Sequence, residues 1–217
     1  MINLVRPASA CYPAPPVVAT RPFPASKRAF DLVVALLVSV FVLSWLIPLI
    51  GLLIRLESRG PVLFVQLRTG RNNQPFPCLK FRTMRHDRAA GFRQAQKNDP
   101  RITRLGAFLR RTNLDEMPQF LNVLAGHMSV VGPRPHAVQH DAQYFNRIPQ
   151  YSARYSTKPG ITGVAQTRGC RGEACLNAMK QRVRLDLWYI RHQSLGLDLA
   201  LCWWTVRKMI QGDDRAW

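Results

Sequence analysis

An uncharged run from Leu32 to Ile54 constrains this chain more than any other feature. Its 23 residues exceed the roughly 20 that an α-helix needs to cross the hydrocarbon core of a bilayer. Pro48 lies inside the run and Ser44 lies one turn before it. Because proline removes a backbone hydrogen bond and kinks a helix, while a serine hydroxyl can partly satisfy the freed carbonyl, we predict a break at Ser44 and Pro48.

The flanks of this run are basic on both sides, with Lys27 and Arg28 before it and Arg55 and Arg59 after it. A spanning helix usually has its Lys and Arg residues concentrated on the cytoplasmic side. Nearly symmetric flanks are also typical of a re-entrant hairpin that enters and leaves by one face. The residues alone leave a spanning helix and a hairpin about equally supported.

Charge and cysteine content narrow the class of protein. Lys and Arg number 31 against 12 for Asp and Glu, a net charge of +19, so we expect an anionic partner: nucleic acid, an anionic membrane surface or a phosphorylated substrate. The five cysteines follow neither a zinc-site nor a disulfide pattern, which is typical of a reducing compartment. The proline-rich segment 1–26 is predicted to be a disordered tail.

The stretch from Arg110 to Pro135 contains an adjacent acidic pair, Asp115 and Glu116, in this basic chain. Apolar residues at helical spacing follow, and Asn113 with Glu116 three residues on has the pattern of a capping box. We therefore predict a helix that starts near Leu114, with both acids in its first turn. Such acids are common as ordinary helix starts, and an aspartate there is expected to stay ionised.

Cations around this pair indicate phosphoryl chemistry. Arg110 lies just upstream, and Arg134 is held in the rigid turn Gly132–Pro135. Lys80 alternates with apolar residues in a second predicted strand, 76–84, which follows a first strand, 62–67. A carboxylate can attack phosphorus or hold Mg²⁺, and cations neutralise the phosphate oxygens.

The motifs K-F-R-T-M at 80–84, D-P-R-I-T-R-L-G at 99–106 and K-P-G-I-T-G-V-A-Q at 158–166 occur in this order around the acidic pair. Together they resemble the bacterial sugar transferases that prime polysaccharide synthesis, the monotopic polyprenyl-phosphate phosphoglycosyltransferases. G-P-R-P-H at 132–136 and R-G-E at 171–173 resemble the branch that transfers glucose 1-phosphate. The chain departs from the family pattern at Leu67, His127 and Gly196.

The resemblance implies a mainly α fold with a small β component (α+β). It implies a re-entrant membrane hairpin over 27–60, weighted about three to one over a spanning helix. A catalytic domain over 61–217 would lie on the cytoplasmic face of the bacterial inner membrane. Amphipathic helices are expected at 101–111 and 194–210, the second with Trp203, Trp204, Arg207 and Lys208 either at the membrane interface or in the core. Since only the tail precedes the hairpin here, we expect a minimal catalytic-domain form.

The resemblance also implies the reaction: a sugar 1-phosphate, glucose 1-phosphate by this branch, passes from a UDP-sugar to undecaprenyl phosphate with release of UMP. Asp115 would attack the β-phosphorus, and Asp115 with Glu116 would bind Mg²⁺. Phosphate or substrate contacts are expected from a further set of residues: Lys80, Arg110, Arg134, Arg171 and Asp186. Asp186 also fits a salt bridge on a helix surface, and His136 and His140 fit either sugar contacts or structural roles.

Two alternatives remain open. The same reaction with galactose or an N-acetylhexosamine differs only in the sugar. A membrane-tethered basic module that binds nucleic acid or anionic lipid explains the charge and the apolar run, but it leaves the acidic pair and the Gly-Pro motifs unexplained. No pattern of a nucleic-acid-binding fold is present, so we expect no nucleic-acid partner. Homo-oligomerisation is left open.

Overall fold

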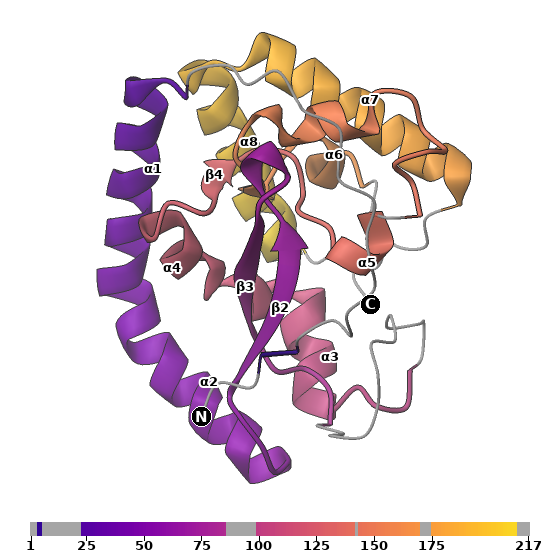
Figure 1. Ribbon diagram of the computed structural model, residues 1–217. Coiled ribbons are helices and arrows are strands. Elements are labelled where there is room, and N and C mark those ends of the chain that lie inside the picture. Colours follow the sequence, from indigo (N-terminus) through magenta and orange to yellow (C-terminus); the bar gives the residue numbers. More distant parts are fainter. Residues whose placement is uncertain (1–3, 6–22, 86–98, 142, 170–174, 212–217) are drawn as a thin grey trace.

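The computed structural model describes residues 4–5, 23–85, 99–141, 143–169 and 175–211 (Figure 1). The chain is mostly helical with a small β component, as predicted. Its elements, in chain order, are β1 Leu4–Val5, α1 Ala25–Val38, η1 Ser39–Leu43, α2 Ser44–Glu57, β2 Leu63–Thr69, η2 Arg71–Asn73, β3 Pro75–Phe81, α3 Arg104–Arg111, η3 Leu114–Glu116, α4 Gln119–Leu124, β4 Ser129–Val131, α5 Val138–Asp141, η4 Tyr151–Ser156, β5 Gly160–Thr162, α6 Val164–Thr167, α7 Leu176–His192 and α8 Leu195–Gln211.

The apolar run forms one helical segment from Ala25 to Glu57, which curves along one side of the molecule (Figure 1). The predicted break is absent at Pro48, which lies inside α2. Irregularity falls just upstream instead, in the π-helical turn η1, where the amide of Ser44 donates to the carbonyl of Ser39. The Ser44 hydroxyl donates to the Val40 carbonyl at 2.7 Å. Pro48 has no N–H to donate to the carbonyl of Ser44, which lies one turn after Val40, so the hydroxyl does not satisfy the carbonyl that Pro48 leaves free.

This long helix packs one face against the rest of the protein along its whole length. The buried residues recur at helical spacing, and they are Lys27, Asp31, Ala35, Leu43, Leu46, Ile50, Gly51 and Ile54. The opposite face exposes large apolar side chains, among them Leu36, Phe41, Trp45, Leu52 and Leu56. The extra residue of the π-helical turn keeps the buried positions aligned over both halves. The helix is therefore long and apolar enough to cross a membrane, and 22% of its apolar window is buried against the rest of the protein.

The basic residues before the run, Lys27 and Arg28, bind groups within the protein. The buried Lys27 ammonium pairs with Asp198 at 2.7 Å and donates to the Tyr189 hydroxyl at 3.0 Å. The guanidinium of Arg28 donates to the carbonyls of Val123 and Leu124, at the end of α4. These contacts attach the start of α1 to the body of the protein.

Asp31 makes a second attachment of the same helix. Its carboxylate accepts from the Val130 amide and the Ser129 hydroxyl, both at 2.9 Å, at the start of β4. Its side chain is fully buried, and this desolvation raises the pKa of Asp31. The charge-free stretch was counted from Leu32, so the sequence analysis missed this residue.

Strands β2 and β3 form the antiparallel hairpin that the sequence predicted, with Leu63 paired with Phe81 and Thr69 paired with Pro75. Arg82 follows β3 and donates to the carbonyls of Ile54, Ser58 and Arg59, so it caps the end of α2. Leu4 and Val5 add β1 to this sheet, within the segment expected to be disordered; residues 1–3 and 6–22 of that segment lie outside the described part.

A second sheet pairs β4 with β5 in parallel, which brings the Gly132–Pro135 turn beside the K-P-G-I-T-G motif. Helix α8, Leu195–Gln211, was predicted close to its observed bounds as 194–210. Helix α3 begins only at Arg104, because the Thr103 hydroxyl accepts from the Gly106 amide and caps it there. Trp203 and Trp204 on α8 are 68% and 54% exposed, which excludes the core-packing alternative for both.

The Lys27–Asp198 contact predicts a large loss of stability on Lys27→Met. The substitution leaves a carboxylate and a hydroxyl buried without the ammonium, and removing one partner of a buried ion pair costs about 3–5 kcal/mol. Chemical denaturation in detergent micelles measures the free energy of unfolding. The control is Arg55→Met, an exposed cation on α2, which should change it by less than about 0.5 kcal/mol. Equal stabilities for the two variants would contradict this interpretation of Lys27.

Candidate active site

A tight turn, rather than the predicted first turn of an α-helix, places the acidic pair. Asn113 has a left-handed backbone with φ of 58°, a conformation that asparagine tolerates better than most residues. Asp115 and Glu116 then lie in the 3₁₀ turn η3, and the α-helix begins only at Gln119, after Pro118. The capping box is wrong: the Asn113 side chain makes no capping hydrogen bond, and the Glu116 carboxylate binds cations instead.

Both oxygens of Glu116 accept charged hydrogen bonds. Oε1 lies 2.6 Å from Lys80 Nζ and 2.6 Å from Arg134 Nη2, and Oε2 accepts from Arg134 Nη1 at 3.1 Å. Burial alone would raise the pKa of Glu116, but the two cations outweigh it and hold this pKa well below its usual value. Glu116 is therefore a permanent anion that fixes two cationic side chains in place.

Asp115 is equally buried but far less well paired. Lys80 Nζ lies 3.6 Å from its Oδ2, and this is the only ion pair that the described residues give it. Desolvation is the main reason why the pKa of Asp115 is raised; Lys80 lowers it, the neighbouring Glu116 raises it again, and Arg110 lowers it. The α-helix start that we expected beside this aspartate is a 3₁₀ turn instead, and burial is the largest influence on its pKa. An incompletely paired carboxylate of raised basicity suits a nucleophile.

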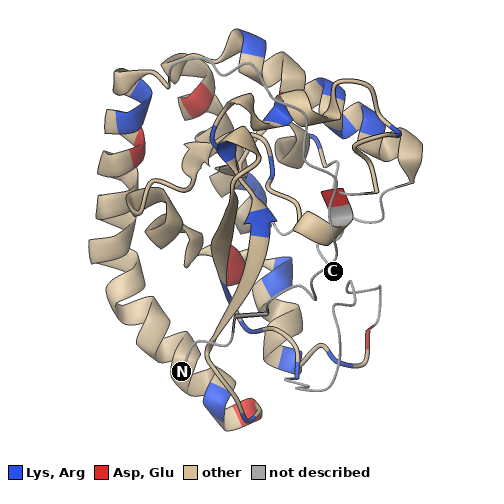
Figure 2. Cartoon of the chain, in the orientation of Figure 1, with Lys and Arg blue, Asp and Glu red and all other residues tan. Residues whose placement is uncertain are grey.

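Three separate elements bring cations to this pair. Lys80 lies on β3, Arg110 on α3 and Arg134 in the turn after β4. Arg110 donates from Nε to the Thr83 hydroxyl at 2.9 Å, and burial lowers its pKa while Asp115 raises it. Lys80 and Arg134 thus pair with the acidic residues, and Arg110 lies near enough for Asp115 to affect its pKa, whereas contact of these cations with phosphate stays a prediction. Figure 2 shows that acidic residues are few and basic residues many along the chain.

Two of the glycine-containing motifs form one structural unit. The Gly132 amide donates to the Thr162 carbonyl, and the Gly160 amide donates to the Pro133 carbonyl, both at 2.9 Å. A side chain on Gly132 would meet the Lys158 carbonyl at 2.6 Å, so only glycine permits this approach. The K-P-G-I-T-G segment thereby supports the turn that carries Arg134.

Arg154 is a positioning residue that the sequence analysis missed. Its fully buried guanidinium donates to the Arg134 carbonyl at 2.8 Å and pairs with Asp186 at 2.7 Å. Asp186, expected to touch substrate, is thus buried behind Arg134, and we revise its role to support of Arg154. The signal was available as an arginine in an aromatic segment, Tyr151–Ser156, but the motif comparison did not draw attention to it.

The histidines and Arg171 were further candidates. His136 is buried against the Tyr151 hydroxyl at 2.7 Å and Arg154 at 2.9 Å, and burial holds its pKa well below the usual value, so it has the structural role. The exposed His127 stacks on Phe76. Arg171 and the side chain of His140 lie outside the described residues.

A metal ion would have to share this site with its substrate. Within the described ranges no group of three or more His, Cys, Asp or Glu side chains comes together. Mg²⁺ is commonly held by one or two carboxylates with phosphate oxygens and water completing the shell, so Asp115 fits this donor set. Because Lys80 and Arg134 occupy both oxygens of Glu116, a metal bond from Glu116 requires the exchange of one of these contacts.

Buried carboxylates, converging cations and a long apolar helix define a membrane-associated class of protein built for phosphate chemistry. The chain belongs to the bacterial sugar transferase family, whose model matches residues 23–212.

Individual relatives make this membership more specific. The chain is 48% identical over 186 residues to the UDP-glucose:undecaprenyl-phosphate glucose-1-phosphate transferase of Escherichia coli (strain K12), covering 84% of this chain and 39% of that protein. It is 48% identical over 191 residues to the protein of the same name from Caulobacter vibrioides, covering 87% and 71%. It is 47% identical over 186 residues to the exopolysaccharide production protein PSS of Rhizobium leguminosarum bv. phaseoli, covering 83% and 92%. The chain thus spans about two fifths of the E. coli relative.

The ion pairs of Glu116 predict a pH-dependent contribution to stability. Since its folded-state pKa lies below that of the unfolded chain, the stabilisation is complete above the unfolded value, near 4.5, and is lost as pH falls through the folded value. At pH 7 we expect Glu116→Gln to lower the free energy of unfolding by about 3 kcal/mol. The difference from the wild type should shrink as the pH falls below about 4.5, as measured by denaturation at several pH values. The control is Glu57→Gln on the exposed end of α2, and a difference that grows on acidification would contradict the assignment.

Proposed function

We propose that this protein transfers glucose 1-phosphate from UDP-glucose to undecaprenyl phosphate and releases UMP, as a priming step of exopolysaccharide or other glycoconjugate synthesis. The observation that carries the proposal is the unequal pairing of two adjacent buried carboxylates. Glu116 is saturated by Lys80 and Arg134, whereas Asp115 has one longer contact. The names of the relatives supply the substrates of this proposal.

The chemistry would proceed in two displacements at one phosphorus. In the first, a carboxylate oxygen of Asp115 bonds to the β-phosphorus, and the bond from that phosphorus to the bridging oxygen breaks, so UMP leaves. In the second, an oxygen of the lipid phosphate bonds to the same phosphorus, and the bond to Asp115 breaks. The product is a polyprenyl-diphosphate sugar, and the Asp115 carboxylate is regenerated.

The fixed cations serve the charge that develops in these steps. Glu116 holds Lys80 and Arg134 in place before substrate arrives, so their positive charge is preorganised and costs no rearrangement. Arg110 adds a third positive charge, and it is anchored by Thr83. Mg²⁺ held by Asp115 and the diphosphate would offset the repulsion between carboxylate and substrate. Arg171 remains a proposed substrate contact on the basis of the R-G-E resemblance.

A shallow membrane seat is the second part of the proposal. The long helix packs on the body along its length and exposes only its outer apolar face, so it cannot cross a bilayer without taking the charged body with it. We infer a re-entrant, monotopic arrangement at the cytoplasmic face of the inner membrane. The surplus of basic residues would favour anionic lipid there.

Other sugars and another class of protein remain as alternatives. Relatives 38% and 37% identical are named for transfer of N-acetylgalactosamine and for UDP-galactose, so the choice of glucose rests on the names of the relatives with 46–48% identity. A basic membrane-tethered binding module without catalysis has no use for an incompletely paired, buried Asp115.

The reaction predicts lipid-dependent UMP release from UDP-glucose in the presence of Mg²⁺. Asp115→Asn should lower this rate by about a thousandfold or more, because the amide cannot form the covalent intermediate. UMP is measured with purified protein, polyprenyl phosphate and a panel of UDP-sugars. Glu57→Gln is the control, since this carboxylate is exposed at the end of α2, outside the site. Preference for another sugar would overturn glucose alone. UMP release beyond one equivalent per enzyme without lipid, or unchanged release by Asp115→Asn, would overturn the mechanism.

The membrane seat predicts that both ends of the long helix lie on the cytoplasmic side. In a cysteine-free background, Ser26→Cys and Arg59→Cys should both react with a membrane-impermeant maleimide in inverted vesicles and resist it in intact spheroplasts. A spanning helix would instead expose one position in each preparation. Labelling of both after detergent lysis controls for their accessibility.

A further inference from the structure

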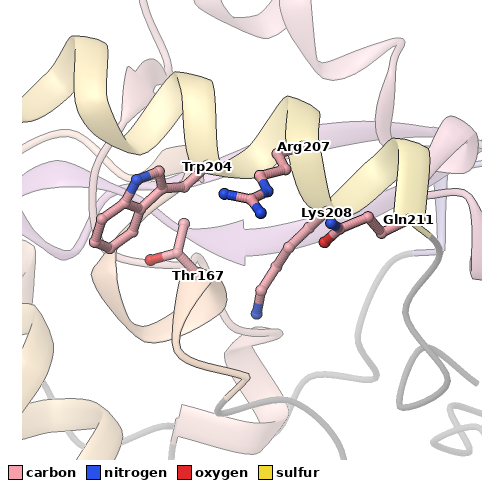
Figure 3. A pocket seen from close by; sticks show the side chains of 5 residues that line it. All are labelled: Thr167, Trp204, Arg207, Lys208 and Gln211. Carbon is pink, nitrogen blue, oxygen red and sulfur yellow. The ribbon is translucent and has the colours of Figure 1, made fainter.

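A hollow of about 220 Å³ opens between α6 and the last turns of α8 (Figure 3). Its lining consists of Thr167, Trp204, Arg207, Lys208 and Gln211. Figure 3 shows Trp204, Arg207 and Lys208 extending from one side of α8 around Thr167. The acidic pair and its cations are not part of this lining, so the hollow is a feature that the proposed mechanism has not used.

The residues that line the hollow suit a ligand that carries an aromatic ring next to an anionic group. Trp204 is 54% exposed and offers an indole face on which a ring can stack. Exposure of so much apolar surface to water is unfavourable unless a ligand covers it. Within the part of the chain that the structure describes, no carboxylate is paired with Arg207 or Lys208. The Thr167 hydroxyl donates to the carbonyls of Gly163 and Val164. Its oxygen is left as an acceptor for a ligand N–H or O–H.

The position of the hollow on α8 favours a soluble ligand over a lipid headgroup. Leu199, Trp203 and Val206 form an exposed apolar stripe on this helix. At 100° per residue, Trp204 and Lys208 lie on a different side of α8 from the middle of that stripe. If the apolar stripe faces the membrane, the hollow is turned away from the lipid.

The hollow is also fixed relative to the segment that supports the Arg134 turn. The Thr205 hydroxyl on α8 bonds the Thr162 hydroxyl at 2.5 Å, and Thr162 belongs to the K-P-G-I-T-G motif. Thr167 follows directly after the end of that motif at Gln166. The same short stretch of chain therefore supports both the Arg134 turn and one wall of the hollow.

We propose that this hollow binds a nucleoside phosphate, with the base stacked on Trp204 and a phosphate held by Arg207 and Lys208. Its volume of about 220 Å³ is below the roughly 300–1,000 Å³ of sites that enclose a drug-sized ligand, so it would cover one side of a nucleoside monophosphate and leave the rest in solvent. This inference rests on the proposed function, in which a uridine nucleotide is both the donor and, as UMP, the leaving group.

The test is calorimetric titration of UMP into the full-length protein in nanodiscs. Trp204→Leu removes the stacking face, and the double variant Arg207→Gln/Lys208→Gln removes the charge. Each should weaken UMP binding by about tenfold or more, the scale of one base stacked on an aromatic ring or of a lost charged contact. Trp203→Leu and Arg191→Gln are matched controls, an exposed indole and an exposed cation outside the hollow, and should stay within about twofold of the wild type.

Two further arms separate the alternatives. If the hollow variants bind UMP like the wild type, the inference is wrong. If they bind UMP normally but bind anionic vesicles less well than the wild type, the hollow binds the phosphate of a lipid headgroup instead. Asp115→Asn keeps the hollow intact and should still bind UMP. UMP binding that depends on Trp204 in a protein without transferase activity would defeat the proposed function alone. Normal turnover with unchanged KM for UDP-glucose in the hollow variants would defeat this inference alone.

Discussion

The contact on which this site depends is the one between buried Glu116 and two cations. A carboxylate at this depth would be strongly disfavoured without partners, and Lys80 and Arg134 provide them on both of its oxygens. This contact also changes the surroundings of the neighbouring Asp115. Lys80 is drawn to Glu116 at 2.6 Å and reaches Asp115 only at 3.6 Å, so burial dominates the pKa of Asp115 and raises it. Two adjacent acids in one turn thereby differ in pairing: Glu116 fixes two cations, and Asp115, the nucleophile that we propose, has one longer contact.

The remaining architecture holds these groups where they are. Arg154 and Asp186 support the backbone of Arg134 from inside, and the K-P-G-I-T-G segment packs against the turn from the other side. At the opposite end, Lys27 and Asp31 attach the apolar helix to the body through buried polar contacts. In the membrane arrangement that we propose, a helix attached in this way would set the height of Asp115 above the membrane.

The sequence predicted the acidic pair, its three cations and the hairpin that carries Lys80, because chemistry and alternation are local signals. It did not predict the contacts made across the fold. Asp31 and Arg154 are single charged residues with no distinctive spacing, and their partners are 99 and 32 positions away in the chain. The capping box failed for a related reason: the local pattern at Asn113 was correct, but the tertiary pull of Lys80 and Arg134 on Glu116 prevailed. The break expected at Pro48 likewise gave way to packing of the helix on the core.

The central claim is that Asp115 becomes covalently bonded to the phosphosugar. The most direct measurement is mass spectrometry of the purified protein after brief incubation with UDP-glucose and Mg²⁺, without lipid acceptor. The account predicts one added hexose phosphate on the peptide that contains Asp115, its absence in Asp115→Asn, and its loss when polyprenyl phosphate is added. UMP release with no adduct under any of these conditions, or an adduct on a different residue, would contradict it.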